Sequence, residues 1–442
     1  SQAYYCEDPF LNQLGVNPVF NLLTSTLDDN RKENRTLHLM SEEDALSKVQ
    51  KYLHRQGIDR LSPIARKVER EGTPNRRNVV LVFMESMSAN LMGTFGSDKK
   101  LTPYLDSLYQ QSLSFSHFYS SGIHTNHGIY STLYSFPAIM KRNAMKGSVI
   151  PVYSGLPTVL QENGYCNLFF MTHESQYDNM NAFLRTNGFD EIYAQENYPS
   201  EKVVNSFGVQ DDFMYQYALP ILNERAGTGN PFFSVLLSIS NHPPYVIPPY
   251  FHPHSDVLEE QIVEYADWSI RQFMQAAEKQ PWFDNTIFVF LGDHGKMVGT
   301  PECEMPQSYN HIPLMIYGKD IKPGVYDGFG GQVDVSPTLL GLLNISYLQN
   351  NFGVNLLEEE RPCMFFTADN LIGARDSVNM FIYSPDSQQE FKYKLEEGKL
   401  HAATGTDEEA FRNLKDYCFS MLQSTESLVK EHKTLDKVSV KK

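Results

Sequence analysis

Residues 78–85 read NVVLVFME, a short apolar run that is rich in valine and ends on an acid. A run of this length and composition predicts a strand that is covered on both faces. An acid at the tip of a buried strand is costly unless it is paired or binds a cation. Glu85 is therefore the first candidate functional residue, with helix capping or an ordinary ion pair as the alternatives.

Similar apolar runs recur along the chain, at 166–171, 232–239, 287–291, 312–317 and 364–366. Helical patterns separate them, at 102–111, 157–163, 209–224, 259–279 and 333–343. Strands that alternate with helices predict an α/β fold with a central, mostly parallel sheet sandwiched by helices.

The two ends of the chain differ from this pattern. Residues 1–75 are charge-rich around 28–51 and end at a Gly-Thr-Pro-Asn break, so we expect a helical arm or linker. Residues 76–345 then form the main α/β domain. Residues 346–442 are expected to be a smaller α+β part that completes it, with a hairpin at 379–383 and 391–395 and a helix near 407–428.

Charge and composition exclude some classes of protein. The chain has 37 Lys+Arg against 53 Asp+Glu, a net charge of −16, which argues against sequence-independent binding of nucleic acid. No apolar run reaches the ~20 residues that a membrane helix needs. The five cysteines form no CxxC pair and are compatible with two disulfides or none; they are Cys6, Cys166, Cys303, Cys363 and Cys418.

Two further groups of polar residues follow predicted strands. Asp293 and His294 follow TIFVFLG and offer an oxygen and a nitrogen ligand to a divalent metal, although such a triplet with Gly295 is also common in turns. Thr125 follows a strand-like segment and opens a helix-like one. A hydroxyl there sits where helix N–H groups favour anions, and simple helix capping is the alternative.

His242 follows the apolar run FFSVLLSIS and adds an imidazole. In an open parallel sheet, ligands bind beyond the carboxyl ends of the strands. A carboxylate, a hydroxyl, an Asp-His pair and an imidazole at four strand ends predict a metal-dependent site. Lys296 could pair with a phosphate or with Glu302, and His311 is expected to be structural.

Five motifs follow one another between Asn78 and Leu343: NVVLVFMESMSANLMGTFGSDKKLTPYLDSL, FSHFYSSGIHTNHG, SNHPPY, LGDHG and VDVSPTLLGLL. Together they resemble the sulfatase-like branch of the alkaline phosphatase superfamily, and within it the lipoteichoic acid synthases and related phosphoglycerol transferases.

The resemblance implies a set of site residues. One divalent cation would be held by Glu85, Thr125, Asp293 and His294, with Mn²⁺ expected and Mg²⁺ or Zn²⁺ as alternatives. Thr125 would be the nucleophile. His242 would contact the substrate phosphate and protonate the leaving group.

Two departures from the family pattern limit this transfer. Thr125 lacks the Pro and Arg that accompany formylglycine maturation in sulfatases, so hydrolysis of sulfate esters is not expected. Residues 172–180 lack the Trp and Arg that hold glycerol phosphate in lipoteichoic acid synthases. His173 and Tyr177 are expected to substitute, unless the head group differs. His127 is a further candidate contact for the substrate.

The resemblance predicts an enzyme: a phosphoglycerol-type transferase that acts on phospholipid head groups through a phospho-threonine intermediate. Its partners would be an anionic phospholipid donor and a glycan, glycerol or glycolipid acceptor of the cell envelope. The full-length protein would be tethered to the cell membrane, with the catalytic domain on the periplasmic or extracellular side. The alternatives are a phosphodiesterase or sulfatase-like hydrolase, a phosphoethanolamine transferase, and a non-enzymatic binding protein of the same fold.

Overall fold

The computed structural model describes residues 35–405 and 408–437 of the chain. Its centre is an eight-stranded sheet with the order β5-β4-β6-β2-β7-β8-β3-β9. The strands are β2 (Asn78–Met84), β3 (Leu113–Tyr119), β4 (Cys166–Met171), β5 (Glu191–Tyr193), β6 (Phe232–Leu237), β7 (Thr286–Gly292), β8 (Leu314–Tyr317) and β9 (Gly324–Gly331).

The direction of the strands decides where the site lies. Strand β8 is antiparallel to both of its neighbours, and the other neighbouring pairs of the sheet are parallel. Strands β2, β3, β4, β6 and β7 therefore all point the same way, and their carboxyl ends meet at one edge. The fully buried faces of β2 and β7 agree with the apolar runs that predict them.

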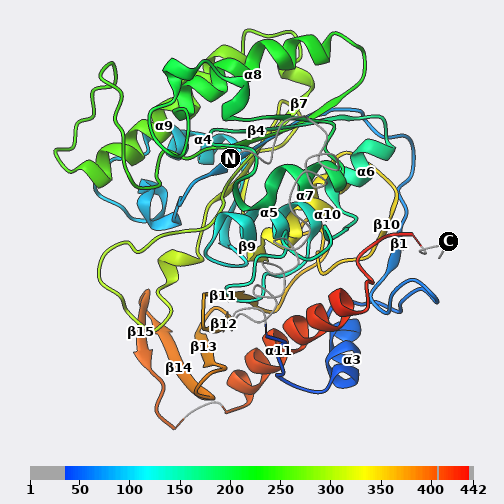
Figure 1. Ribbon diagram of the computed structural model, residues 1–442. Helices are drawn as coiled ribbons and strands as arrows, with labels where there is room; N and C mark the ends of the chain where they lie inside the picture. Colours follow the sequence, from blue (N-terminus) through cyan, green and yellow to red (C-terminus); the bar gives the residue numbers. More distant parts are fainter. Residues whose placement is uncertain (1–34, 406–407, 438–442) are drawn as a thin grey trace.

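Helices cover both faces of the sheet (Figure 1). One face carries α4 (Pro103–Gln111), α8 (Asp211–Ala226) and α9 (Leu258–Ala277), whose apolar side chains pack with Val80 and Val82 of β2. The other face carries α5 (Thr125–Tyr134), α6 (Leu156–Glu162), α7 (Met180–Thr186) and α10 (Val335–Leu342). The alternation of β2 side chains between two cores confirms the expected sandwich.

The C-terminal part contains a second sheet, antiparallel and five-stranded. It consists of β11 (Met364–Thr367), β12 (Ile372–Arg375), β13 (Asn379–Ser384), β14 (Gln389–Glu396) and β15 (Lys399–Ala402). Helix α11 (Glu408–Lys430) packs on it and on α3 (Glu42–Tyr52), beside which it lies in Figure 1. Strand β1 (Arg66–Val68) pairs with β10 (Tyr347–Gln349), so the described end of the N-terminal segment lies against the later part of the chain.

Some expectations need correction. The apolar run 364–366 belongs to the second sheet and not to the central one. Strand β9 has the sequence GVYDGFGG, and its glycines hide it from a search for apolar runs. The start of the expected arm and Cys6 lie outside the described residues. The four described cysteines are free, and among the described helices none has the length and hydropathy of a membrane span.

Candidate active site

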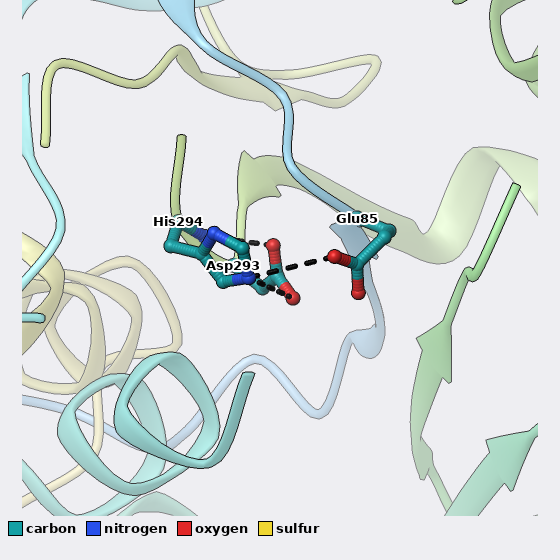
Figure 2. A group of neighbouring side chains, drawn as sticks. All are labelled: Glu85, Asp293 and His294. Atoms are coloured by element: carbon teal, nitrogen blue, oxygen red, sulfur yellow. Dashed lines mark hydrogen bonds and ion pairs between the residues drawn. The ribbon is translucent and has the colours of Figure 1, made fainter. Parts of the chain in front are cut away.

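The ends of β2 and β7 bring together three side chains of the kinds that can hold a metal ion (Figure 2), and we call them the metal-ligating cluster. Met84 and Gly292 are partners in the sheet, so the residues that follow them are neighbours. Ligand atoms of Glu85, Asp293 and His294 all lie within 4.8 Å of one another. His294 Nε2 lies 3.4 Å from Glu85 Oε1 and 3.6 Å from Asp293 Oδ2.

Thr125 completes this cluster from the first residue of α5. Its Oγ1 lies 2.8 Å from Asp293 Oδ2 and 3.2 Å from Glu85 Oε2. The helix approaches closely because residue 128 is glycine: a Cβ there would lie 2.3 Å from the Asp293 carbonyl oxygen. The hydroxyl thus faces two carboxylates, and the N-terminus of a ten-residue helix opens beside it.

The carboxylates are held by hydrogen bonds from the backbone and from a serine. Asp293 Oδ1 accepts from the backbone N–H groups of Ser86 at 2.9 Å and of His294 at 2.7 Å. The Ser86 hydroxyl donates to Glu85 Oε1 at 2.7 Å. Gln332 donates its amide to the Asp293 carbonyl oxygen at 2.8 Å. These partners fix the cluster before any ligand binds.

The electrostatics of the cluster favour the binding of a cation. Burial, together with the like charge of Glu85, raises the pKa of Asp293 to about 7. Burial would raise the pKa of Glu85 as well, but its hydrogen bond to His294 and the charge of that ring lower it to about 2. Two buried carboxylates cannot both ionise cheaply at this spacing without a cation.

The donor set fits a divalent metal ion. His294 Nδ1 lies 2.7 Å from the Gly295 carbonyl oxygen, which can only accept, so Nδ1 carries the proton and Nε2 is free to bind a metal. Two carboxylates, a hydroxyl and one imidazole suit Mn²⁺ or Mg²⁺ and tolerate Zn²⁺. The identity of the ion stays a prediction.

Two more histidines are fixed in the same way. His242 Nδ1 donates to the Pro243 carbonyl oxygen at 2.6 Å, and His173 Nδ1 donates to that of Glu174 at 3.0 Å. Each neutral ring therefore presents Nε2 as a hydrogen-bond acceptor. Both rings lie near the cluster. The charge of Glu85 contributes to the pKa of His173, and a charge on His242 contributes to the pKa of Glu85.

Aromatic rings connect these two histidines. The ring centroids of His173 and Tyr177 are 4.8 Å apart, those of Tyr177 and Phe207 6.2 Å, and those of Phe207 and His242 4.2 Å. We call these four residues the ring wall. Phe207 carries no signal in the sequence, because it comes from a loop that precedes α8 and not from a strand end.

The remaining candidates, His127, His311 and Lys296, each form a hydrogen bond to a protein group other than the three clustered ligands. His127 is buried, and its Nε2–H donates to the Arg142 carbonyl oxygen at 2.9 Å. The expected contact of His127 with substrate stays a prediction. His311 is bound to the Ser116 carbonyl oxygen at 2.8 Å. Lys296 donates to Asn241 Oδ1 at 2.6 Å and not to Glu302.

The sulfatase family model matches residues 77–345, which covers the central sheet and the cluster. The chain belongs to the sulfatase family. This membership agrees with the order of motifs along the chain and with the metal-ligating cluster that they form. A phosphotransferase or a sulfatase-like hydrolase is the class of enzyme that the matches support.

Relatives of this sulfatase-family chain include lipoteichoic acid synthases and a protein similar to them. It is 25% identical over 362 residues to lipoteichoic acid synthase-like YvgJ of Bacillus subtilis, covering 74% of the chain and 56% of the relative. It is 24% identical over 400 residues to lipoteichoic acid synthase of Staphylococcus aureus, covering 80% and 58%. The chain thus spans about half the length of the curated relatives it matches.

Two solved structures share the fold. A protein of the alkaline phosphatase superfamily from Vibrio parahaemolyticus superposes with a TM-score of 0.80 at 24% identity, covering 91% of this chain and 99% of that one. The lipoteichoic acid synthase LtaP of Listeria monocytogenes gives a TM-score of 0.70 at 22% identity, covering 87% and 98%. The alkaline phosphatase-like fold expected from the sequence is confirmed.

Proposed function

We propose that the chain is the catalytic part of a metal-dependent, phosphoglycerol-type transferase that acts on phospholipid head groups through a phospho-threonine intermediate. The observation that carries the proposal is the position of Thr125. Its hydroxyl lies at the N-terminus of α5 and within 3.2 Å of both carboxylates of the metal-ligating cluster. The lipoteichoic acid synthases among the relatives support the choice of reaction.

In the first step, Thr125 Oγ1 attacks the phosphorus of a phosphodiester, and the bond from phosphorus to the lipid oxygen breaks. Asp293 Oδ2 accepts the hydrogen bond of the attacking hydroxyl, orients it and takes its proton, which returns to Thr125 Oγ1 when the bond to phosphorus breaks in the second step. The positive end of the α5 dipole, beside Thr125, favours the negative charge of the phosphate. Glu85, Asp293, His294 and Thr125 would hold a divalent cation, which would supply further charge stabilisation and lower the pKa of the hydroxyl.

His242 is the proposed acid and base. Its Nδ1 is held by the Pro243 carbonyl oxygen, so a proton is taken up and released at Nε2. The leaving diacylglycerol alcohol takes that proton. In the second step, an acceptor hydroxyl gives its proton back to Nε2 and attacks the phosphorus, and the bond to Thr125 breaks. His173 and Tyr177 of the ring wall bind the head group.

The proposed partners are an anionic phospholipid as donor and a glycan, glycerol or glycolipid as acceptor. The full-length protein is proposed to be tethered to the cell membrane, with this part on the periplasmic or extracellular side. The same nucleophile serves a hydrolase when water takes the place of the acceptor. The acceptor therefore has to be decided by experiment.

The test incubates the Mn²⁺-loaded protein with fluorescent phosphatidylglycerol and follows intact protein mass. We expect a mass gain of one glycerol phosphate on Thr125, release of labelled diacylglycerol, and neither in Thr125→Ala. Thr132→Ala, on the same helix with a buried hydroxyl that has no hydrogen-bond partner, is the control for helix integrity. Equal behaviour of wild type and Thr125→Ala would remove the proposal and favour a binding protein.

The fate of the head group separates the enzymatic alternatives. Its appearance on an added glycolipid or glucan supports transfer, and its release as free glycerol phosphate supports hydrolysis. Phosphatidylethanolamine in place of phosphatidylglycerol tests the phosphoethanolamine alternative in the same assay.

A further inference from the structure

Lys296 is a cation that lies beside the metal-ligating cluster without an anionic partner. It is partly buried, two residues after His294. Its Nζ donates to a neutral amide oxygen, Asn241 Oδ1, at 2.6 Å, and lies 5.5 Å from the centroid of the Tyr245 ring. Among the described residues it forms no ion pair, whereas Lys146, near Thr125, is paired with Asp178 at 3.2 Å.

The position of this ammonium group is fixed by the cluster itself. The backbone N–H of Lys296 donates to Ser88 Oγ at 2.8 Å. Asn241 donates its amide N–H to the Ser86 carbonyl oxygen at 3.1 Å, which sets the direction of the amide oxygen toward Lys296. Ser86 in turn donates to Asp293 Oδ1. A continuous chain of hydrogen bonds therefore connects the ammonium group to a carboxylate of the cluster.

A partly buried cation with a single neutral partner is incompletely satisfied. An ammonium group has three N–H donors, and within the described part of the chain only one of them has a protein acceptor. Withdrawing such a charge from water is costly unless an anion or further acceptors compensate. The arrangement therefore favours an anionic ligand at Lys296.

The stretch that carries His173 and Tyr177 of the ring wall supplies no lysine or arginine of its own. Residues 172–180 contain the acids Glu174 and Asp178 and no Lys or Arg. A phosphodiester that is being transferred carries negative charge on its two non-bridging oxygens. One of these lies toward the cluster and α5, and the other needs a separate donor.

We propose that Lys296 is a substrate-binding residue that donates a charge-assisted hydrogen bond to a non-bridging oxygen of the transferred phosphate. This rests on the proposed function, which places that phosphate between Thr125 and His242. Asn241, the residue before His242, is the positioning residue that holds the ammonium group in place. No covalent bond forms or breaks at Lys296.

The test measures calorimetric binding of sn-glycerol 3-phosphate, and of neutral glycerol, to the Mn²⁺-loaded protein. Lys296→Met should weaken binding of glycerol 3-phosphate about tenfold or more, the worth of a charge-assisted hydrogen bond, and leave binding of glycerol unchanged. Lys202→Met is the matched control, since Lys202 also lies over a ring, that of Phe213 at 5.4 Å, but is exposed.

Asn241→Asp gives a reciprocal test. The new carboxylate lies beside the ammonium group of Lys296 and should form an ion pair with it. The variant should then bind glycerol 3-phosphate as weakly as Lys296→Met does. Metal content is measured for every variant. Loss of Mn²⁺ from Lys296→Met would overturn the assignment, because a nearby cation is expected to oppose and not to assist metal binding.

The remaining outcomes also decide the question. Wild-type affinity for glycerol 3-phosphate in Lys296→Met, or no binding by the wild-type protein, overturns the inference. If glycerol 3-phosphate binds in a way that depends on Lys296, but the lipid transfers no glycerol phosphate to Thr125, the inference is supported and the proposed function is removed. Phosphorylation of Thr125 at the same KM in wild type and Lys296→Met supports the function and removes the inference.

Discussion

The hydroxyl of Thr125 lies 2.8 Å from Oδ2 of Asp293, although 168 residues separate them in the chain. The contact exists because β3 and β7 run in the same direction, so that the helix after β3 begins at the edge where β7 ends. It also requires α5 to press on the backbone after β7.

Gly128→Ala should reduce activity more than it reduces stability. The new Cβ would lie 2.3 Å from the Asp293 carbonyl oxygen, so α5 must move away and carry Thr125 with it. Overpacking of this kind costs about 1–3 kcal/mol of stability, and a shift of ~1 Å at a reacting group costs about 10²-fold in rate. Thermal melting and kcat measure the two effects.

Gly324→Ala is the control for that substitution. Gly324 has open space where a Cβ would stand, so its alanine variant should keep both the melting temperature and kcat. Equal kcat in Gly128→Ala and wild type would show that the close approach of α5 is not needed.

Asp293→Asn should release the metal ion. The amide replaces one carboxylate oxygen and removes a negative charge from a cluster that uses two carboxylates. Mutation of a group that hydrogen-bonds a metal ligand typically lowers metal affinity 10–100-fold. Mutation of the ligand itself should lower it further. Metal content after dialysis checks this. Asp106→Asn, at a carboxylate that caps backbone N–H groups of Gly93 and Thr94, should retain full metal content.

Phe207→Ala should raise KM for the lipid donor with a smaller effect on kcat. The ring lies between Tyr177 and His242 and has no polar atom for the chemistry. Its loss opens the ring wall and removes ring contacts. Each ring pair contributes about 0.5–1.5 kcal/mol in addition to the free energy of burying its apolar surface. Steady-state kinetics separate the two constants. Phe213→Ala, whose ring packs on Tyr198 and not on the ring wall, serves as control. A kcat defect with unchanged KM in Phe207→Ala would contradict this role.

His311 should make the fold sensitive to acid. Burial lowers its pKa from 6.5 to about 4. As pH falls below 6.5, the unfolded chain therefore binds a proton that the folded chain excludes. The stability that depends on the neutral ring is full above pH 6.5 and is lost toward pH 4, at about 1.4 kcal/mol per pH unit. Urea unfolding at a series of pH values measures the slope.

His311→Gln is the comparison for this prediction. Glutamine cannot take up a proton in this range and can still donate to the Ser116 carbonyl oxygen. The variant should be less stable at pH 7, because it loses the stacking on Tyr119, and its stability should fall less steeply between pH 6.5 and 4. Identical slopes in the two proteins would refute the prediction.

Local sequence was enough to predict the central strands and the residues at their tips. Buried parallel strands need unbroken apolar runs, so 78–84 and 166–171 were recognised with their observed bounds. Polar residues that directly follow such runs, such as Glu85 and Asp293, stand out because burial there is costly. The glycine-rich β9 could not be inferred, because it contains no apolar run. The run 312–317 predicted the strand β8 but not its antiparallel direction, which an apolar run does not encode.

The sequence by itself determined the residue types of the cluster and the α/β class, because hydrophobic periodicity and strand-end polarity are local properties of the chain. Only the tertiary structure decided which side chains meet. Phe207 joins the ring wall, and Lys296 meets Asn241, through loops from different strands, and such contacts depend on how the loops fold over a common edge. Distances between residues far apart in sequence are set by packing of the whole sheet, which no local pattern encodes.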